Sequence, residues 1–166
     1  MKTELHVHTR FSHDSLLGLN LLAVMCKIKK INCVVICDHN TISGVYKARK
    51  VLSNYGIGVI AGEEIFTDSG EIIGLFLKKN IPPGLTAIET VYSIKSQGGL
   101  VYIPHPYDCK RCKTVLKVEA LKEIADQIDF IEVHNGRNIS LDFSIRQKEI
   151  ADQYTDSEKT VRICGS

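Results

Sequence analysis

The stretch CVVICDHN, Cys33 to Asn40, joins a short apolar run to a polar ending. The first five residues of this stretch are apolar and three of them are β-branched, which favours a strand buried on both faces over a helix. Segments with helical spacing lie on both sides, over residues 17–30 and 42–55. A buried strand between two helices predicts a βαβ unit and therefore a mainly parallel sheet.

The same alternation of short apolar runs and helical segments continues along the whole chain. Only the third and fourth runs are joined tightly, through the turn Thr67-Asp68-Ser69-Gly70. No glycine-rich phosphate loop follows the first run, so an α/β fold of the small (β/α) barrel kind is favoured over an open doubly wound sheet. The predicted strands are 4–8, 33–39, 58–64, 71–78, 100–105, 129–135 and 160–164, and the predicted helices are 17–30, 42–55, 85–97, 115–127 and 141–154.

Composition limits the class of protein. The chain has 166 residues, of which 44% are hydrophobic and 24% charged, with a formal net charge of +2. These values are ordinary for one soluble domain, and they argue against nucleic-acid or membrane binding driven by bulk charge, although a small local basic site is compatible with them. No apolar run approaches the roughly 20 residues of a membrane span, and the start lacks a signal-peptide pattern. We therefore expect a cytoplasmic protein with no membrane partner.

The six cysteines are expected to be reduced thiols, because several lie in apolar runs and a cytoplasmic protein rarely forms disulfides. Cys109 and Cys112 have the spacing of a zinc ribbon. A structural zinc site needs a second pair at the right distance and none follows, so we do not expect one here.

The six histidines concentrate where predicted strands end. His6 and His8 lie two apart in the first strand, so both imidazoles can point to one side and converge on one ion. In a (β/α) barrel the carboxyl ends of the strands form the catalytic face. The other histidines follow the same rule, with His13 just beyond the first strand and His39, His105 and His134 at the ends of later ones.

Carboxylates accompany these histidines. Asp14 follows the first strand, and Glu63 and Glu64 are adjacent at the end of the third, so that only one of the two can point inward. Asp38 can either orient a neighbouring ligand or cap the following loop. Mixed imidazole and carboxylate ligands suit a multinuclear site of Zn²⁺, Mn²⁺ or Fe²⁺ better than Mg²⁺ or Ca²⁺. Such a site favours displacement at phosphorus.

The order of the motifs HVHTRFSHDS, CDHNTISG, GEEI and IPHP resembles the PHP family, named for polymerase and histidinol phosphatase. The resemblance extends over essentially the whole chain and is strongest to the stand-alone metal-dependent phosphoesterases, whose openings read D-L-H-x-H-[ST]-x-[YF]-S-x-D-S. It implies a distorted (β/α)7 barrel with two or three divalent metal ions at the carboxyl ends of the strands. It also implies hydrolysis of phosphoesters by a metal-bound hydroxide.

The resemblance assigns metal ligands position by position. The first motif supplies a histidine pair and, six residues after the second histidine, an acidic ligand. In GEEI the bridging carboxylate is the second residue after the glycine, which selects Glu64 over Glu63. The implied metal ligands are His6, His8, Asp14, His39, Glu64 and His105.

Three further residues, Arg10, Asn135 and Arg137, are placed by the same resemblance where they can meet a substrate phosphate. A solvated or loop-structuring role is the open alternative for each of them.

The sequence departs from the family pattern at two places. No histidine occurs between Ile65 and Tyr102, and Ile72-Ile73-Gly74 stands where some relatives read H-[IL]-L-G. One metal position is therefore expected to be poorly coordinated, empty, or completed by water or His134. The chain also stops at Ser166, before the G-S-D-A-H motif that supplies the last ligands in relatives. We expect residues 1–166 to be a single PHP domain that lacks its C-terminal end.

The expected function is hydrolysis of a phosphomonoester or phosphodiester of a small metabolite, nucleotide or oligonucleotide. Two alternatives remain open. One is a catalytically impaired PHP module with a structural or metal-binding role, and the other is amidohydrolase-type C–N cleavage, against which the lack of a strand-borne lysine near the cluster counts. The sequence leaves the oligomeric state and the identity of the phosphoester open.

Overall fold

The computed structural model describes residues 1–106, 114–135, 141–155 and 159–165. Cys109, Cys112 and Arg137 lie outside these ranges. The strands are β1 (Thr3–Val7), β2 (Cys33–Ile36), β3 (Gly58–Thr67), β4 (Gly70–Leu75), β5 (Leu100–Ile103), β6 (Phe130–Asn135) and β7 (Val161–Gly165), and the helices are α1 (Leu19–Lys29), α2 (Ser43–Ser53), α3 (Ala87–Ser96), α4 (Val118–Glu123) and α5 (Leu141–Tyr154).

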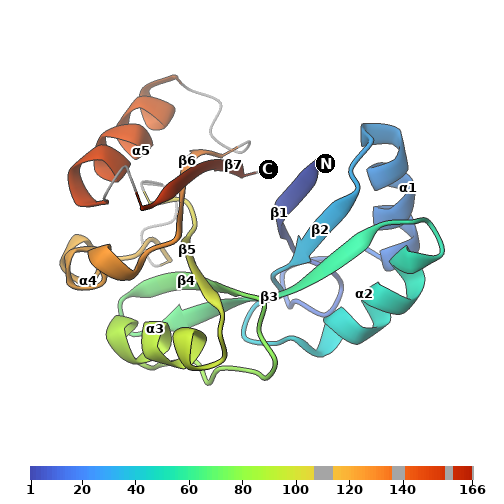
Figure 1. The fold of residues 1–166 in the computed structure, drawn as a ribbon, viewed down its shortest axis with the longest axis horizontal. Coiled ribbons are helices and arrows are strands. Elements are labelled where there is room, and N and C mark those ends of the chain that lie inside the picture. Colours follow the sequence, from blue (N-terminus) through green and yellow to red (C-terminus); the bar gives the residue numbers. More distant parts are fainter. Residues whose placement is uncertain (107–113, 136–140, 156–158, 166) are drawn as a thin grey trace.

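The strands form one sheet in sequence order, from β1 to β7. Strand β4 runs antiparallel to both of its neighbours, and the other neighbouring pairs are parallel. The sheet curls so that β7 and the C-terminal end lie near β1 (Figure 1). This curled seven-strand half-barrel confirms the predicted barrel class and excludes the doubly wound alternative, in which strand order is not sequential.

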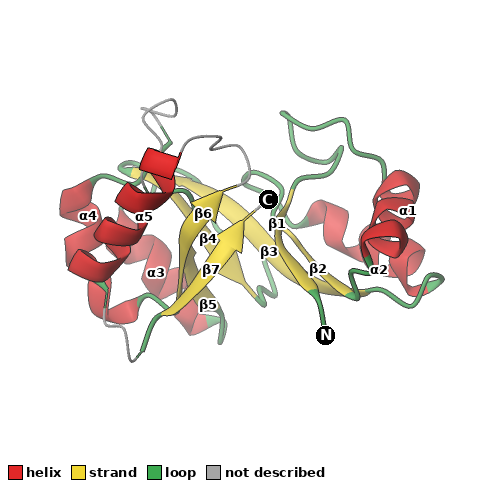
Figure 2. Cartoon of the chain, turned by 90° about the horizontal axis from the view of Figure 1, so that it is seen from above, coloured by secondary structure: helices red, strands yellow, loops and turns green. Residues whose placement is uncertain are grey.

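Apolar side chains pack on both surfaces of the curled sheet. Helices α1 and α2 lie at one end of the molecule, and α3, α4 and α5 at the other (Figure 2). The first pair covers the outer face of β1–β3 through residues such as Leu22 and Ala48. The second group buries residues such as Ile94 and Leu121. A third cluster, with Ile73 and Tyr102 among its members, fills the inside of the curl.

The tight link between β3 and β4 sets the direction of β4. The Thr67 hydroxyl donates to the Gly70 carbonyl at 2.6 Å, which closes the predicted turn. Gly70 has φ +129°, and a Cβ at this position would lie 2.5 Å from Leu116 Cα, so only glycine fits. Because β4 is reversed, its first residues, not its last, lie beside the carboxyl ends of the parallel strands.

Most predicted elements are shorter in the structure, and for two of them the contacts show why. The helix predicted over 115–127 begins at Val118 because the preceding backbone binds the β3–β4 turn: Lys117 N–H donates to Ser69 O, and Glu71 N–H donates to Thr114 O, each at 2.8 Å. The strand predicted over 71–78 ends at Leu75, since Phe76 has φ +60°, which interrupts extended pairing.

No helix in the described part of the chain has the length and apolarity needed to span a membrane. The described cysteines Cys26, Cys33, Cys37 and Cys164 are free thiols.

Candidate metal centre

A register shift in β1 turns His6 toward the inside of the barrel. Glu4 pairs with Val34 and Val7 pairs with Ile36, so two residues of β1 face one residue of β2. A bulge of this kind re-aims side chains locally. As a result, the consecutive residues Leu5 and His6 both reach the inside. Leu5 packs against the interior cluster, and the His6 and Tyr102 rings lie nearly perpendicular with their centroids 6.1 Å apart.

The Glu64 carboxylate lies at the centre of four imidazoles. Its Oε2 is 3.2 Å from His6 Nε2, 2.9 Å from His8 Nε2 and 3.5 Å from His39 Nδ1, and its Oε1 is 3.2 Å from His105 Nε2. The glutamate is fully buried. Chain segments at the ends of β1, β2 and β5 therefore bring imidazole nitrogens next to one carboxylate on β3.

The adjacent glutamate faces away from this centre. Glu63 is also fully buried, but its carboxylate accepts the Ile81 N–H at 2.9 Å on the opposite side of β3. Burial raises the pKa of Glu63 to about 7. The two neighbours thus occupy different environments, as the alternation of side chains along a strand requires.

Three groups of potential ligand atoms share residues with one another. They are His6 with His8 and Glu64, His8 with Asp14 and His39, and His39 with Glu64 and Glu71; within each group the ligand atoms lie within 4.8 Å of one another. Glu64 belongs to two groups, as do His8 and His39. This sharing is the arrangement expected where ligands bridge neighbouring ions.

The charges of these groups favour ion binding. Burial by itself would raise the pKa of Glu64, but the charge of His6 and hydrogen bonds from His105, His6 and His8 hold this pKa well below its ordinary value. Burial lowers the pKa of His39, against the opposing effect of Glu64. An ionised carboxylate next to a neutral imidazole is the protonation state that metal binding needs.

Asp14 completes one group from the loop after β1. Burial would raise the pKa of Asp14, but the Ser12 hydroxyl, which donates to its Oδ1 at 2.7 Å, and the neighbouring His8 and His39 lower it. Its Oδ2 lies 3.5 Å from His39 Nε2. Asp14 is thus ionised and close enough to share an ion with His39.

Glu71 is the residue that the sequence analysis missed. It is buried on β4 opposite Phe66, with Oε1 3.4 Å from His39 Nδ1 and Oε2 3.4 Å from His105 Nε2. Aligning Glu71-Ile72-Ile73-Gly74 with H-[IL]-L-G would have placed this glutamate at the histidine of relatives. The position expected to be poorly coordinated therefore holds a carboxylate, while His134 is exposed and belongs to none of the three groups.

Two further buried carboxylates hold the backbone next to candidate ligands. Asp38 accepts the Thr9 N–H at 2.6 Å and the Thr9 hydroxyl at 2.8 Å, which fixes the chain directly after His8. Burial raises the pKa of Asp38, and these bonds act against that rise. Glu132 accepts the N–H of His105, whose φ of +32° departs from ordinary backbone. Of the two roles open to Asp38, these bonds favour the orientation of a neighbouring ligand over a cap on the following loop, because they hold the residue directly after His8.

Of the three residues predicted to meet a substrate phosphate, the structure describes the side chain of Arg10 alone. Arg10 follows His8 by two residues, and its exposed side chain lies over the Phe11 ring, with Cζ 6.0 Å from the ring centre. The backbone of Asn135 ends β6, but its side chain is outside the described part, and so is Arg137. His13 is exposed, with its ring centroid 5.1 Å from that of His39.

The ligand spacing fits divalent transition metals. His6 Nε2 and His8 Nε2 lie 3.0 Å apart, and Glu64 Oε2 is close to both. Bonds of about 2.0–2.1 Å in a tetrahedral site put neighbouring ligand atoms roughly 3.3 Å apart. Two imidazole nitrogens and a carboxylate oxygen that face one another at such distances match one divalent ion between them.

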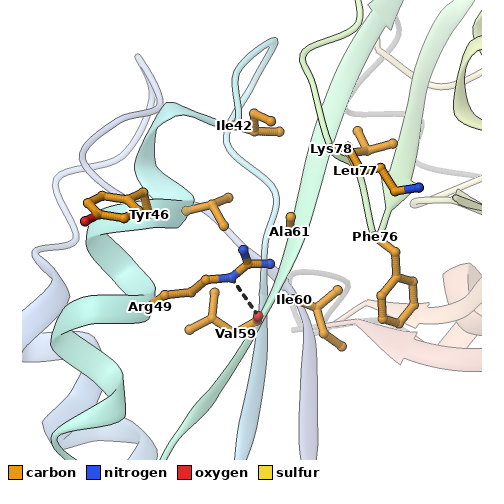
Figure 3. A pocket seen from close by; sticks show the side chains of 10 residues that line it. Ile42, Tyr46, Arg49, Val59, Ile60, Ala61, Phe76, Leu77 and Lys78 are labelled. Carbon is orange, nitrogen blue, oxygen red and sulfur yellow. Dashed lines mark hydrogen bonds between the residues drawn. The ribbon is translucent and has the colours of Figure 1, made fainter. Parts of the chain in front are cut away.

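A cavity of about 550 Å³ lies outside the barrel, apart from this centre. It lies between α2 and residues 76–78. Because β3 and β4 are joined by a tight turn, no helix follows β3 to cover it here. Figure 3 shows Arg49 on one side, with its Nε donating to Val59 O at 3.4 Å, and Phe76 on the other. None of the candidate ligands lines this cavity.

The candidate ligands gather at the carboxyl ends of the parallel strands. This arrangement is typical of (β/α)-barrel proteins with a metal site on that face of the barrel. The chain belongs to the PHP domain family, whose match extends over residues 4–131. The resemblance noted in the motifs is thereby confirmed.

Relatives and solved structures agree with this membership. The chain is 43% identical over 122 residues to the uncharacterized protein MJ1587 of Methanocaldococcus jannaschii (66% of this chain, 71% of that protein) and 38% identical over 156 residues to MJ0417 of the same organism (93% and 61%). It is 27% identical over 119 residues to a 5′-3′ exoribonuclease of Haemophilus influenzae (64% and 43%). The matches to MJ0417 and the exoribonuclease thus span less than two thirds of those proteins.

Two solved structures share the fold at low sequence identity. A candidate metal-dependent phosphoesterase from Bifidobacterium adolescentis has a TM-score of 0.78 at 18% identity, and an amidohydrolase from Chromobacterium violaceum with bound sulfate has a TM-score of 0.74 at 16% identity. Each similarity covers 100% of this chain and 87% of the other chain.

Proposed function

We propose that the protein is a metal-dependent phosphoesterase that hydrolyses a phosphomonoester or phosphodiester of a small metabolite, nucleotide or oligonucleotide. The observation that carries the proposal is the buried Glu64 carboxylate, surrounded within 3.5 Å by nitrogens of four histidines from three chain segments. A structural role would not require so many titratable groups with mutually facing lone pairs at one strand end.

Each ligand group would hold one ion, and Glu64 would bridge two of them. His6 and His8 would bind on the β1 side, and His39 with Glu71 on the β4 side. His105, beside both glutamates, would join the second site. Asp14 would bind a third ion with His8 and His39. Divalent ions in such a cluster lower the pKa of an attacking water and stabilise negative charge on the oxygens around phosphorus.

The chain's own residues supply order around this chemistry. Asp38 holds Thr9, and with it the segment carrying His8, while Glu132 holds the backbone of His105. Tyr102 forms the floor beside His6, and burial followed by the charge of Glu132 raises the pKa of its hydroxyl well above the ordinary value, so this tyrosine stays protonated. A neutral, apolar floor keeps water away from the inner side of the ligands.

The similarity to a protein named as a 5′-3′ exoribonuclease supports a nucleic-acid phosphodiester as one substrate to test. The test uses the full chain loaded with Mn²⁺ or Zn²⁺ and follows hydrolysis of para-nitrophenyl phosphate, of bis-para-nitrophenyl phosphate and of a 5′-phosphorylated oligonucleotide. Metal-dependent release of product that is lost in the His105→Ala variant supports the proposal. Stoichiometric metal binding without hydrolysis of any of these esters would instead indicate the impaired, metal-binding module.

A further inference from the structure

The cavity between α2 and residues 76–78 exposes a free edge of β3. Over residues 58–61, β3 pairs with β2 on one side, and its pairing with β4 on the other side begins only at Gly62. Strand β4 ends at Leu75, because Phe76 has φ +60° and turns the chain away from β3. In the described part of the chain, no strand therefore pairs with residues 58–60 on the β4 side, and Val59 lines the cavity there.

The direction of the backbone bonds identifies the polar groups on this edge. Gly58 N–H donates to Asn32 O at 2.8 Å, toward β2, whereas Leu77 N–H donates to Ala61 O at 3.2 Å from the opposite side. Backbone groups of successive strand residues face alternate sides in the plane of a sheet. Val59 precedes Ala61 by two residues, so its N–H and C=O both face the open side. These two groups are the ones that an added strand would pair with.

Cationic side chains flank this edge. Arg49 on α2 and Lys78 line the cavity, and no acidic side chain among the described residues does. Arg49 Nε donates to Val59 O at 3.4 Å, which is longer than the roughly 2.9 Å of an ordinary bond, so this acceptor is only weakly used (Figure 3). Neither cation takes part in an ion pair within the described ranges. The charge of the cavity therefore suits an occupant that carries carboxylates.

Apolar side chains lie beside the same edge. The Val59 side chain packs with the cluster that α1 and α2 form on the outer face of the sheet. Directly opposed residues of paired strands place their side chains on the same face, so a residue laid opposite Val59 would direct its side chain outward. There, Val45 of α2, Leu77 and the half-exposed Phe76 line the cavity, whose volume of about 550 Å³ accommodates an apolar side chain.

Side-chain hydrogen bonds tie the two walls of the cavity together. Asn80 Oδ1 accepts from Ile42 N–H, at the start of α2, at 2.8 Å, and Asn80 Nδ2 donates to Asn40 O at 3.0 Å. Gln97 Oε1 accepts from two successive N–H groups of residues 78 and 79, each at 2.9 Å. The cavity is thus built into the fold, which lowers the cost of ordering its walls when an occupant binds.

We propose that this edge docks an extended acidic peptide segment of a partner protein, which adds a short strand to β3. The main chain of the segment pairs with Val59, an apolar side chain enters the cavity, and acidic groups pair with Arg49 and Lys78. In strand addition of this kind, main-chain bonds give affinity and the side-chain pocket gives specificity. None of the candidate metal ligands lines the cavity, so the inference does not depend on the proposed function.

The first test uses a short labelled peptide, Asp-Leu-Val-Leu-Asp, whose Kd is measured by fluorescence anisotropy. Two N-methylated forms, one methylated at the valine and one at both leucines, block alternate edges of the extended peptide. Because only one edge can pair with Val59, one form should bind about 10-fold more weakly than the parent peptide and the other form should bind nearly as well. The basic peptide Lys-Leu-Val-Leu-Lys should bind more weakly than the acidic one.

The second test compares two double variants that lose the same charge. Arg49→Gln/Lys78→Gln alters the cavity, and Lys50→Gln/Lys79→Gln alters the next residue in each case, which is exposed and does not line the cavity. The cavity variant should raise the Kd of the acidic peptide about 5-fold, and the control variant should raise it less than about 2-fold. In amide NMR spectra of the wild type, the peptide should shift the Val59 signal.

Several results would overturn the proposal. These are the absence of saturable binding at millimolar peptide, equal affinity for the acidic and basic peptides, equal sensitivity to the two methylation patterns, and equal losses in the two double variants. Sedimentation velocity identifies a competing occupant: a dimer that the Arg49→Gln/Lys78→Gln variant dissociates would assign this edge to a second copy of the chain and would also overturn the proposal.

Discussion

Replacing the shared glutamate should remove more than one metal ion. Glu64 belongs to two of the three ligand groups, Glu71 to one and Glu63 to none. Glu64→Gln keeps the shape of the side chain and removes its charge, so both groups lose their ionised carboxylate oxygen. At a metal concentration that saturates the wild type, we expect Glu64→Gln to bind two ions fewer per chain, Glu71→Gln one fewer and Glu63→Gln the same number.

The loss of affinity in Glu64→Gln should be at least about 100-fold for each affected ion, because even residues that only orient a ligand contribute about 10–100-fold. Metal content is measured by elemental analysis after equilibrium dialysis against micromolar Mn²⁺ or Zn²⁺. Circular dichroism of each metal-free variant checks folding, because Glu64 is fully buried among imidazoles and its replacement can also cost stability.

Two outcomes would refute this reasoning. Unchanged metal content in Glu64→Gln would show that the four imidazole contacts of this carboxylate do not mark an ion site. A larger loss in Glu63→Gln than in Glu64→Gln would mean that the faces of β3 are reversed, since a shift of one residue exchanges the two sides of a strand.

Three more outcomes are expected. The holo-protein should release metal as pH falls below about 6, because protons compete for imidazoles with an ordinary pKa of about 6.5; stoichiometric metal at pH 4 would contradict imidazole ligation. Burial raises the pKa of Glu63 from 4.5 to about 7, so between these values the folded state keeps a proton that the unfolded state loses. The free energy of unfolding should therefore fall as pH rises through that window. Urea unfolding at pH 5 and pH 8 should show a smaller fall for Glu63→Gln than for the wild type. Gly70→Ala should cost about 2–4 kcal/mol of stability through strain and overlap with Leu116, and thermal unfolding should show a much smaller effect for Gly58→Ala, where the nearest atom is 3.5 Å away.

Local patterns in the sequence are sufficient to predict the elements and most of the candidate ligands. Alternating strands and helices indicate the barrel class because their periods of two and about 3.6 residues are local properties of the chain. The motif order places His6, His8, His39, Glu64 and His105 near strand ends, and the structure brings the four histidines together around Glu64.

Tertiary packing sets how the strands present these side chains. The reversal of β4 carries Glu71 to the carboxyl ends of the parallel strands, and this depends on a turn at Gly70 packed against Leu116. The bulge in β1 turns both Leu5 and His6 inward, which a strict two-residue alternation does not allow.

The neighbourhood of Arg10 and Lys47 likewise forms only in the folded chain. The two residues are far apart in sequence, and the basic run Lys47-Ala48-Arg49-Lys50 does not indicate that Arg10 lies near it. Both cations lie within 6.0 Å of the centre of the Phe11 ring, because α1 and α2 pack side by side on the outer face of β1–β3. Local sequence patterns specify which face of an element is apolar, whereas the neighbours of a polar side chain depend on how separate elements pack, and no local pattern encodes that.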